Sequence, residues 1–387
     1  MAVSDLQPVH DWFLRRGLPL VLTRRVRSHA LMQRSAPAVA GVGALTAAMM
    51  ALARWTGDDP DYGYVARLGA IAVLLLAAPF VLTLLHRRGT AASERGRRSA
   101  ALLVMAMFVI GMPVTVDGWS TAALAEAPVF LVVTLLTIWL TYLGFGSIAL
   151  WAFRYASTQF GALGNLMGRA LPLLMLTVVV YFTGELWQLS ARMTRERLWQ
   201  TVGFFALIAL LFMVTTIRDE VRALREDRSE QSDPSSLLVG TPFAEIPHDP
   251  SRPPERTALS PAEQINVVAV MVVSQAIQVV FFTAGIFAFF LALGIVAVPD
   301  DVTVLWSSQE TCPVGVPPCA GTWFGVHVPV PQTLVHTSLF VAVLSGLYFT
   351  VSTSVDPLYR QRFFDPLVAD VAVSLAGRDA YLELERA

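Results

Sequence analysis

Residues 261–298 read PAEQINVVAVMVVSQAIQVVFFTAGIFAFFLALGIVAV, and Glu263 is the only charged residue among them. As an α-helix this stretch would extend about 57 Å at roughly 1.5 Å per residue, but the hydrocarbon core of a bilayer is only about 30 Å thick. Ser260, Pro261 and Glu263 stand where an N-cap, a first-turn proline and the acid of a capping box belong. The stretch therefore predicts a long helix that crosses the membrane and continues past it.

The polar residues of this stretch all lie in its first half and are Asn266, Ser274, Gln275 and Gln278. We therefore expect the crossing itself near residues 278–298, with the earlier turns at the inner interface or packed on protein. Gln275 and Gln278 are candidate functional residues, because carboxamides can line a path for a small solute without adding a charge to the membrane interior.

Seven further apolar runs are close to or above the roughly 17–25 residues that cross a bilayer as a helix. Lipid cannot hydrogen-bond an exposed backbone, so such runs are expected to be helical. The composition agrees, since 55% of the 387 residues are hydrophobic and only 15% are charged, against about 25% charged in soluble proteins. The sequence predicts an all-α, polytopic integral membrane helix bundle with about eight transmembrane helices, at residues 36–53, 66–85, 100–116, 128–153, 170–187, 199–217, 264–298 and 333–355.

Arginine sets the expected orientation, because all 28 basic residues are arginines. With the N-terminus inside, 23 of these 28 fall on cytoplasmic segments, as the positive-inside rule requires. This predicts that both chain ends are cytoplasmic and that the protein resides in a bacterial inner membrane. Arg192, Arg195 and Arg197 fit poorly, since they fall outside; they lie either on a short interfacial helix or at an error in the helix count.

Both ends of the chain contain segments that mix apolar and charged residues. Residues 1–35 combine apolar side chains with six arginines, which is typical of a segment that lies on anionic lipid headgroups. Residues 366–385 are expected to form an amphipathic helix that lies on the membrane or docks on a partner, with Val368, Val371, Leu375 and Leu382 on one face. Asp356 and Asp365 each precede a proline, which predicts two helix starts.

The expected division of the chain has seven parts. They are a basic cytoplasmic or interfacial segment (1–35), transmembrane helices one to six (36–217), a cytoplasmic polar linker (218–260), a long transmembrane helix seven (261–298), an extracytoplasmic loop (299–332), transmembrane helix eight (333–355) and a cytoplasmic amphipathic tail (356–387).

The two cysteines, Cys312 and Cys319, lie in the predicted outer loop with three prolines and one glycine between them. A disulfide is expected if this loop faces an oxidising compartment. Zinc would require about four ligands, and only His327 lies nearby, so a metal site is the weaker interpretation.

Ionisable groups within predicted membrane helices are few, and two of them are candidate functional residues. Glu185 could bind a cation or carry a proton, but near the outer end of its run it could also reach headgroup water, paired with Arg192. His336 lies just inside the eighth run and could sense pH, or it could be a satisfied interfacial histidine.

The residue inventory excludes several chemistries. Without lysine there is neither a P-loop nor Schiff-base chemistry, and a net charge of −1 offers nucleic acid no basic surface. We expect no catalytic residues, metal or cofactor. Passage of a small solute or ion is the first expected function. The alternative is a membrane scaffold or accessory subunit of an envelope complex, as a homo-oligomer or with a membrane protein partner. A lipid-modifying enzyme has the least support.

Overall fold

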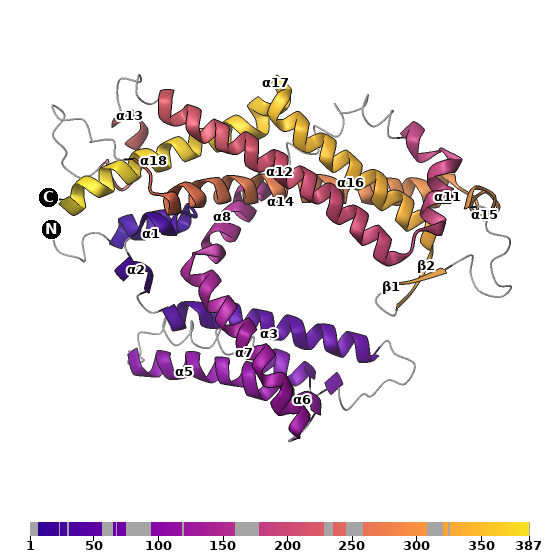
Figure 1. The fold of residues 1–387 in the computed structure, drawn as a ribbon, viewed down its shortest axis with the longest axis horizontal. Coiled ribbons are helices and arrows are strands. Elements are labelled where there is room, and N and C mark those ends of the chain that lie inside the picture. The colour runs from indigo at the N-terminus through magenta and orange to yellow at the C-terminus, as the bar shows by residue number, and fades with distance from the viewer. Residues whose placement is uncertain are drawn as a thin grey trace. The chain divides into compact units, whose positions relative to one another are not determined.

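The fold is almost entirely helical, as the computed structural model in Figure 1 shows. The structure describes residues 7–22, 24–28, 31–55, 65–66, 68–74, 94–117, 120–158, 178–227, 235–244, 258–307, 320–323 and 326–386. The chain divides into two compact units, here called unit 1 (1–21, 147–321 and 328–387) and unit 2 (22–146 and 322–327).

Five helices of the described residues are long and apolar enough to cross a membrane, as expected of a multi-pass membrane protein. They are Arg98–Val116, Thr121–Tyr142, Arg195–Leu224, Pro261–Ala297 and Gln332–Val355. The prediction of a helical fold with several helices long and apolar enough to span a membrane is confirmed. The count of eight helices and the orientation stay predictions, and most of the predicted run 66–85 lies outside the described residues.

Unit 2 is built on α3 (Leu31–Trp55), which covers the predicted run 36–53. It packs mainly against α5 (Glu94–Ala106) and α7 (Thr121–Tyr142). Small side chains of α3, such as Ala40, Ala44 and Ala47, form its buried face, because small residues let helices approach closely. The other elements are α2 (Arg24–Ser28), η3 (Met107–Gly111) and α6 (Met112–Asp117).

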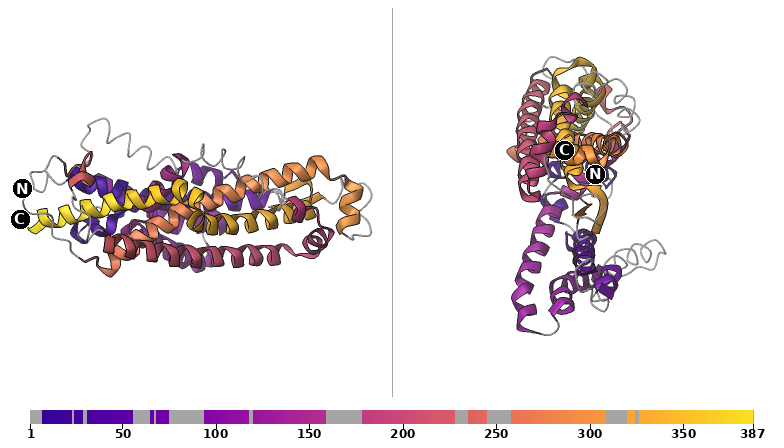
Figure 2. Two further views of the ribbon diagram at one scale, coloured as in Figure 1. Left: turned by 90° about the horizontal axis from the view of Figure 1, so that it is seen from above. Right: turned by 90° about the vertical axis from the view of Figure 1, so that its right-hand side faces the viewer.

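Unit 1 is centred on three long helices, α12 (Arg195–Asp227), α14 (Pro261–Ala297) and α16 (Gln332–Val355), which run side by side (Figures 1 and 2). Shorter helices surround them: α1 (Gln7–Arg15), η2 (Pro19–Val21), most of α8 (Phe145–Thr158), α11 (Gly184–Arg192), α13 (Ser235–Leu238), α15 (Asp300–Ser307), α17 (Pro357–Tyr359), η4 (Arg360–Phe364) and α18 (Asp365–Arg386). Two short strands, β1 (Ala320–Trp323) and β2 (Val326–Pro331), pair with each other.

Helix α14 begins as the sequence predicts. The Ser260 N–H donates to Glu263 Oε2 at 2.7 Å, and the Glu263 N–H donates to Ser260 Oγ at 3.3 Å, so the capping box is complete. The helix ends at Ala297, one residue before the predicted boundary. Its early turns are packed on protein, since Asn266 is 1% exposed, which agrees with one of the two placements predicted for them.

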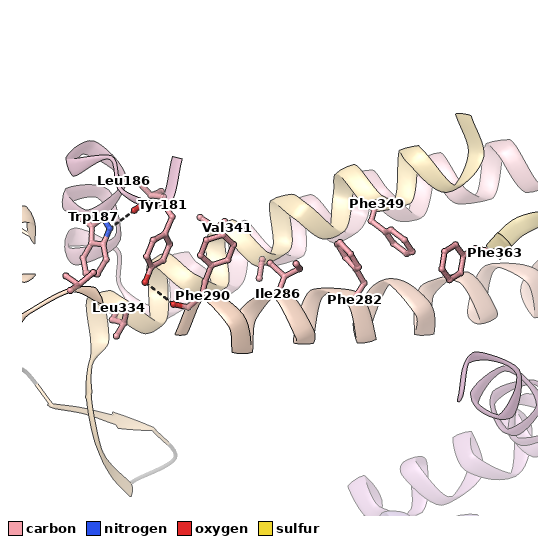
Figure 3. Packing of buried hydrophobic residues seen from close by; sticks show 12 residues of the cluster. Tyr181, Leu186, Trp187, Phe282, Ile286, Phe290, Leu334, Val341, Phe349 and Phe363 are labelled. Atoms are coloured by element: carbon pink, nitrogen blue, oxygen red, sulfur yellow. Dashed lines mark hydrogen bonds between the residues drawn. The ribbon is translucent and has the colours of Figure 1, made fainter. Parts of the chain in front are cut away.

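The contact between α14 and α16, here called the seam, is aromatic over the C-terminal half of α14 (Figure 3). Phe282 stacks on Phe349 with ring centroids 4.4 Å apart and planes at 12°. Further along, the Tyr181 hydroxyl donates to Phe290 O at 3.1 Å, and Trp187 Nε1 donates to Tyr181 O at 2.7 Å. These polar tips are thus satisfied by backbone while the rings fill the seam.

Two predicted runs are not single helices. The run 128–153 is interrupted because Gly144 adopts φ +77°, a left-handed conformation that ends α7 and precedes α8. In the run 170–187 the structure describes residues 178–187. Residues 178–181 are helical, and Thr183, which is extended (φ −86°, ψ 129°), separates them from α11. The apolar composition concealed both breaks.

Helices α17 and α18 begin at Pro357 and Asp365, as the two Asp-Pro pairs predict, but Asp365 is not an extended N-cap residue. Asp365 is helical, and its N–H donates to Arg360 O, which closes the π-helical turn η4. The same arrangement occurs at η3, where the Met112 N–H donates to Met107 O and Pro113 follows. Because proline has no N–H and clashes with the preceding turn, a π-turn just before it lets the helix continue.

Gly346→Ala should destabilise unit 1, because the added methyl group would meet Thr283 across the seam. We expect a loss of about 1–3 kcal/mol in the free energy of unfolding, the usual effect of overpacking. Gly203→Ala on α12 is the matched control, because its methyl would meet nothing within 4 Å. Thermal unfolding of both purified variants provides the measurement, and equal stabilities would contradict the close approach at Gly346.

Candidate functional site

The two ionisable candidates occupy different environments. Glu185 is exposed on the first turn of α11, where an acid suits the helix dipole. His336 is 1% exposed, with Nδ1 at 3.2 Å from Ser190 O and Nε2 at 3.3 Å from Gln332 Nε2. A carbonyl only accepts and an amide nitrogen only donates, so these contacts fit a neutral ring with its proton on Nδ1. His336 thereby ties α16 to α11.

The two carboxamide candidates lie on the buried face of α14. Gln275 is 2% exposed, and its Nε2 donates to Thr353 Oγ1 of α16 at 2.7 Å. Its Oε1 has no partner within the described ranges. Gln278 is three residues after Gln275 and four before Phe282. Since both of those neighbours contact α16, helical periodicity places Gln278 on the same face, toward the seam.

Gln278 differs from Gln275 in that both of its polar atoms lack a partner among the described residues. Its side chain is 0% exposed, and neither Nε2 nor Oε1 has a hydrogen-bond partner in the part of the chain that the structure describes. Most neighbouring hydroxyls are satisfied by their own helix: Ser274 donates to Val270 O, Ser345 to Val341 O and Thr350 to Gly346 O. The hydroxyl of Thr337, nearer the start of α16, is also buried without a partner among the described residues.

A second polar cluster lies at the start of α14 and was not predicted. Arg378 of α18 donates from Nε to Glu263 Oε1 at 2.7 Å and from Nη2 to Glu263 Oε2 at 2.9 Å. Both side chains are buried, at 4% and 9% exposure. Arg378 also donates to Asp379 at 3.0 Å and to Ala258 O at 3.1 Å. Such a bidentate, fully hydrogen-bonded pair offsets much of its desolvation cost.

The N-terminal segment docks beside this cluster. Asn266 of α14 accepts from the Leu20 N–H at 3.0 Å and donates to Gly17 O at 3.1 Å. Arg16 Nη1 lies 2.9 Å from the Asp370 carboxylate of α18. Burial raises the pKa of that carboxyl group, and the charge of Arg16 opposes the shift. The N-terminal segment is therefore held between α14 and α18. Asn266 of α14 bonds to its backbone, and Asp370 of α18 pairs with the charge of Arg16.

Apolar residues at both ends face protein in this structure. Phe13 and Leu22, expected at the headgroups, are 0% and 2% exposed, and Phe13 packs on Phe243 and Tyr381. On α18, Val371 and Leu375 are buried, each at 3% exposure. The amphipathic tail thus packs within its own unit. Contact of the basic segment with anionic lipid stays a prediction that rests on its arginines.

The cluster of Arg378 and Glu263 leaves only a weak signal in the sequence. Arg378 and Glu263 are 115 residues apart, so no local pattern links them. The signal that could have found Arg378 is its position: it stands three residues after Leu375 and three before Tyr381, on the apolar side of the tail helix. The cysteines Cys312 and Cys319 and their expected disulfide lie outside the described residues.

No protein-family model, curated protein or solved structure matches this chain. Within the described residues no group of three or more His, Cys, Asp or Glu side chains could hold a metal ion. The function must therefore be argued from the polar groups of the seam and of the cluster at the start of α14.

Gln278→Met should stabilise the protein, because methionine has a similar shape and removes two buried polar atoms that lack partners. We expect a gain of about 1 kcal/mol in the free energy of unfolding. Gln275→Met is the matched control, since it loses the bond to Thr353 and should bring no gain. Thermal unfolding measures both, and a lower unfolding temperature for Gln278→Met would indicate a protein partner for its amide.

Arg378→Met should destabilise unit 1 by about 3–5 kcal/mol, the usual effect of leaving one buried charge without its partner. Adding Glu263→Gln should recover part of this loss, because glutamine is neutral and still suits a capping box. Arg222→Met, at an exposed position of α12, is the control. A double variant less stable than Arg378→Met would contradict the coupling between Glu263 and Arg378, as measured by denaturant unfolding.

Proposed function

We propose that this chain is a non-catalytic membrane protein that lets a small solute or ion pass across the bilayer along the seam between α14 and α16. The observation that carries the proposal is Gln278, whose buried carboxamide has no partner at either polar atom among the described residues. An unpaired buried amide costs about 1–3 kcal/mol. A passing solute or water would supply the missing hydrogen bonds.

Polar groups occur on both sides of the aromatic contact, which favours a path rather than one isolated polar defect. Gln275 and Gln278 precede Phe282 on α14, whereas Thr337 precedes Phe349 on α16. Because Gln275 contacts Thr353 and Phe282 contacts Phe349, the two helices run in opposite directions, and Thr337 lies on the other side of the stack. The Phe282–Phe349 stack closes the seam between these two groups. Passage in this proposal therefore requires the stack to separate transiently, and the stack acts as the barrier.

The proposed topology keeps eight crossings with both chain ends in the cytoplasm of a bacterial inner membrane. Support comes from the start of α14, where residue 17 of the N-terminal segment bonds to Asn266 and Arg378 of the tail bonds to Glu263. Both terminal segments therefore meet the same end of one helix. Ends that lie on one side of a membrane imply an even number of crossings.

A scaffold or accessory subunit is the second candidate, and the same cluster favours it. Helices α1, α14 and α18 build a part of unit 1 that depends on ion pairs and aromatic contacts, such as Arg16–Asp370 and Phe13–Tyr381. Ion pairs of this kind are typical of a folded segment outside the bilayer, and such a segment can bind a partner protein. This function predicts stable co-purification of one specific membrane protein and no solute flux.

Flux in liposomes that contain the purified protein tests the proposal. We expect uptake of at least one small solute or ion, and Gln278→Met should reduce it about tenfold, as the loss of one hydrogen bond of roughly 1.4 kcal/mol would. Gln264→Met is the matched control, because Gln264 is exposed on the same helix. No flux across a broad panel, from protein with the wild-type unfolding temperature, would overturn the proposal in favour of the scaffold.

A further inference from the structure

We infer that the seam accepts a small neutral molecule that both donates and accepts hydrogen bonds, of the chemical class of urea and glycerol, and that it excludes ions. This inference rests on the proposed passage function and adds the substrate class. It is carried by two features of the described helices: the absence of charge along the seam and the pairing of carboxamides on α14.

The helices around the seam carry no charge over their apolar lengths. Residues 198–217 of α12, 264–297 of α14 and 332–355 of α16 contain no Asp, Glu, Lys or Arg, and these three helices pack on one another. Glu263, the one charged residue of α14, is already held by two hydrogen bonds from Arg378. An ion in the seam would therefore meet no opposite charge.

The carboxamides present complementary groups one helical turn apart. Gln278 offers an unpaired Nε2–H₂ donor and an unpaired Oε1 acceptor, and Gln275 offers a further unpaired acceptor at Oε1. The two residues are separated by a rise of about 4.5 Å at roughly 1.5 Å per residue. A cation could satisfy only the oxygens and an anion only the nitrogen. A molecule such as urea, which carries both N–H donors and a carbonyl acceptor, matches both kinds of group.

Desolvation favours the same class. An ion that leaves water for an uncharged, apolar surrounding loses far more hydration free energy than an amide or a hydroxyl compound does. Two glutamine side chains and a few hydroxyls cannot replace an ion's hydration shell, whereas they can replace the few hydrogen bonds of a neutral polar solute. The uncharged residues of these helices therefore disfavour the entry of ions even when the Phe282–Phe349 stack separates.

Osmotic swelling of proteoliposomes in gradients of urea and of glycerol, run beside K⁺ and Cl⁻ flux from the same preparation, tests the inference. We expect urea or glycerol uptake about tenfold above that of protein-free liposomes. Gln278→Met should lose this uptake by a similar factor, Gln264→Met should keep it, and ion flux should equal that of protein-free liposomes.

The outcomes separate the inference from the function on which it rests. Flux of K⁺ or Cl⁻ that exceeds that of urea and glycerol would overturn the neutral substrate class and leave passage standing. No flux of any probe, from protein with the wild-type unfolding temperature, would overturn both. Uptake of urea or glycerol that Gln278→Met does not change would remove the carboxamide from the path and overturn the inference.

Discussion

Lipid offers polar groups no hydrogen-bond partners, and this constraint governs how unit 1 is built. Its buried hydroxyls donate mainly to their own helix backbone, as Thr350 does to Gly346 O. Its one charged residue within α14, Glu263, is paired with Arg378. Against this background the unpaired carboxamide of Gln278 is the group that requires a role, because protein interiors rarely keep such a group without one.

The buried face of α14 has two parts with different tasks. From Glu263 to Gln278 half of its buried residues are polar, and it binds both terminal segments of the chain. From Phe282 to Gly294 a buried apolar residue or glycine recurs every four residues and packs on α16. Because one continuous helix carries both parts, the docking of the termini also fixes the carboxamides at the border between them.

Local signals predicted α14 well and its partners poorly. The capping box at Ser260 and the apolar length gave both ends of the helix to within one residue, since both signals lie in one continuous segment. Gly144 could not be recognised as a helix end, because the apolar composition is the same on both sides of it. The bond between Glu263 and Arg378 is a tertiary contact across 115 residues, and no local pattern encodes such a contact. The sequence placed Gln275 and Gln278 on turns expected at the inner interface or packed on protein. Their lack of partners among the described residues is visible only in the structure.

Accessibility of position 278 to water-soluble reagents is the most direct test of the central claim, that solutes reach Gln278. The measurement places Gln278→Cys in a background with Cys312 and Cys319 replaced by serine, and follows its reaction with a small hydrophilic thiol reagent in proteoliposomes. Ile286→Cys, two turns further along the same buried face, is the control. The account predicts that Gln278→Cys reacts and Ile286→Cys reacts far more slowly. Equal lack of reaction at both positions, in folded protein, would contradict it.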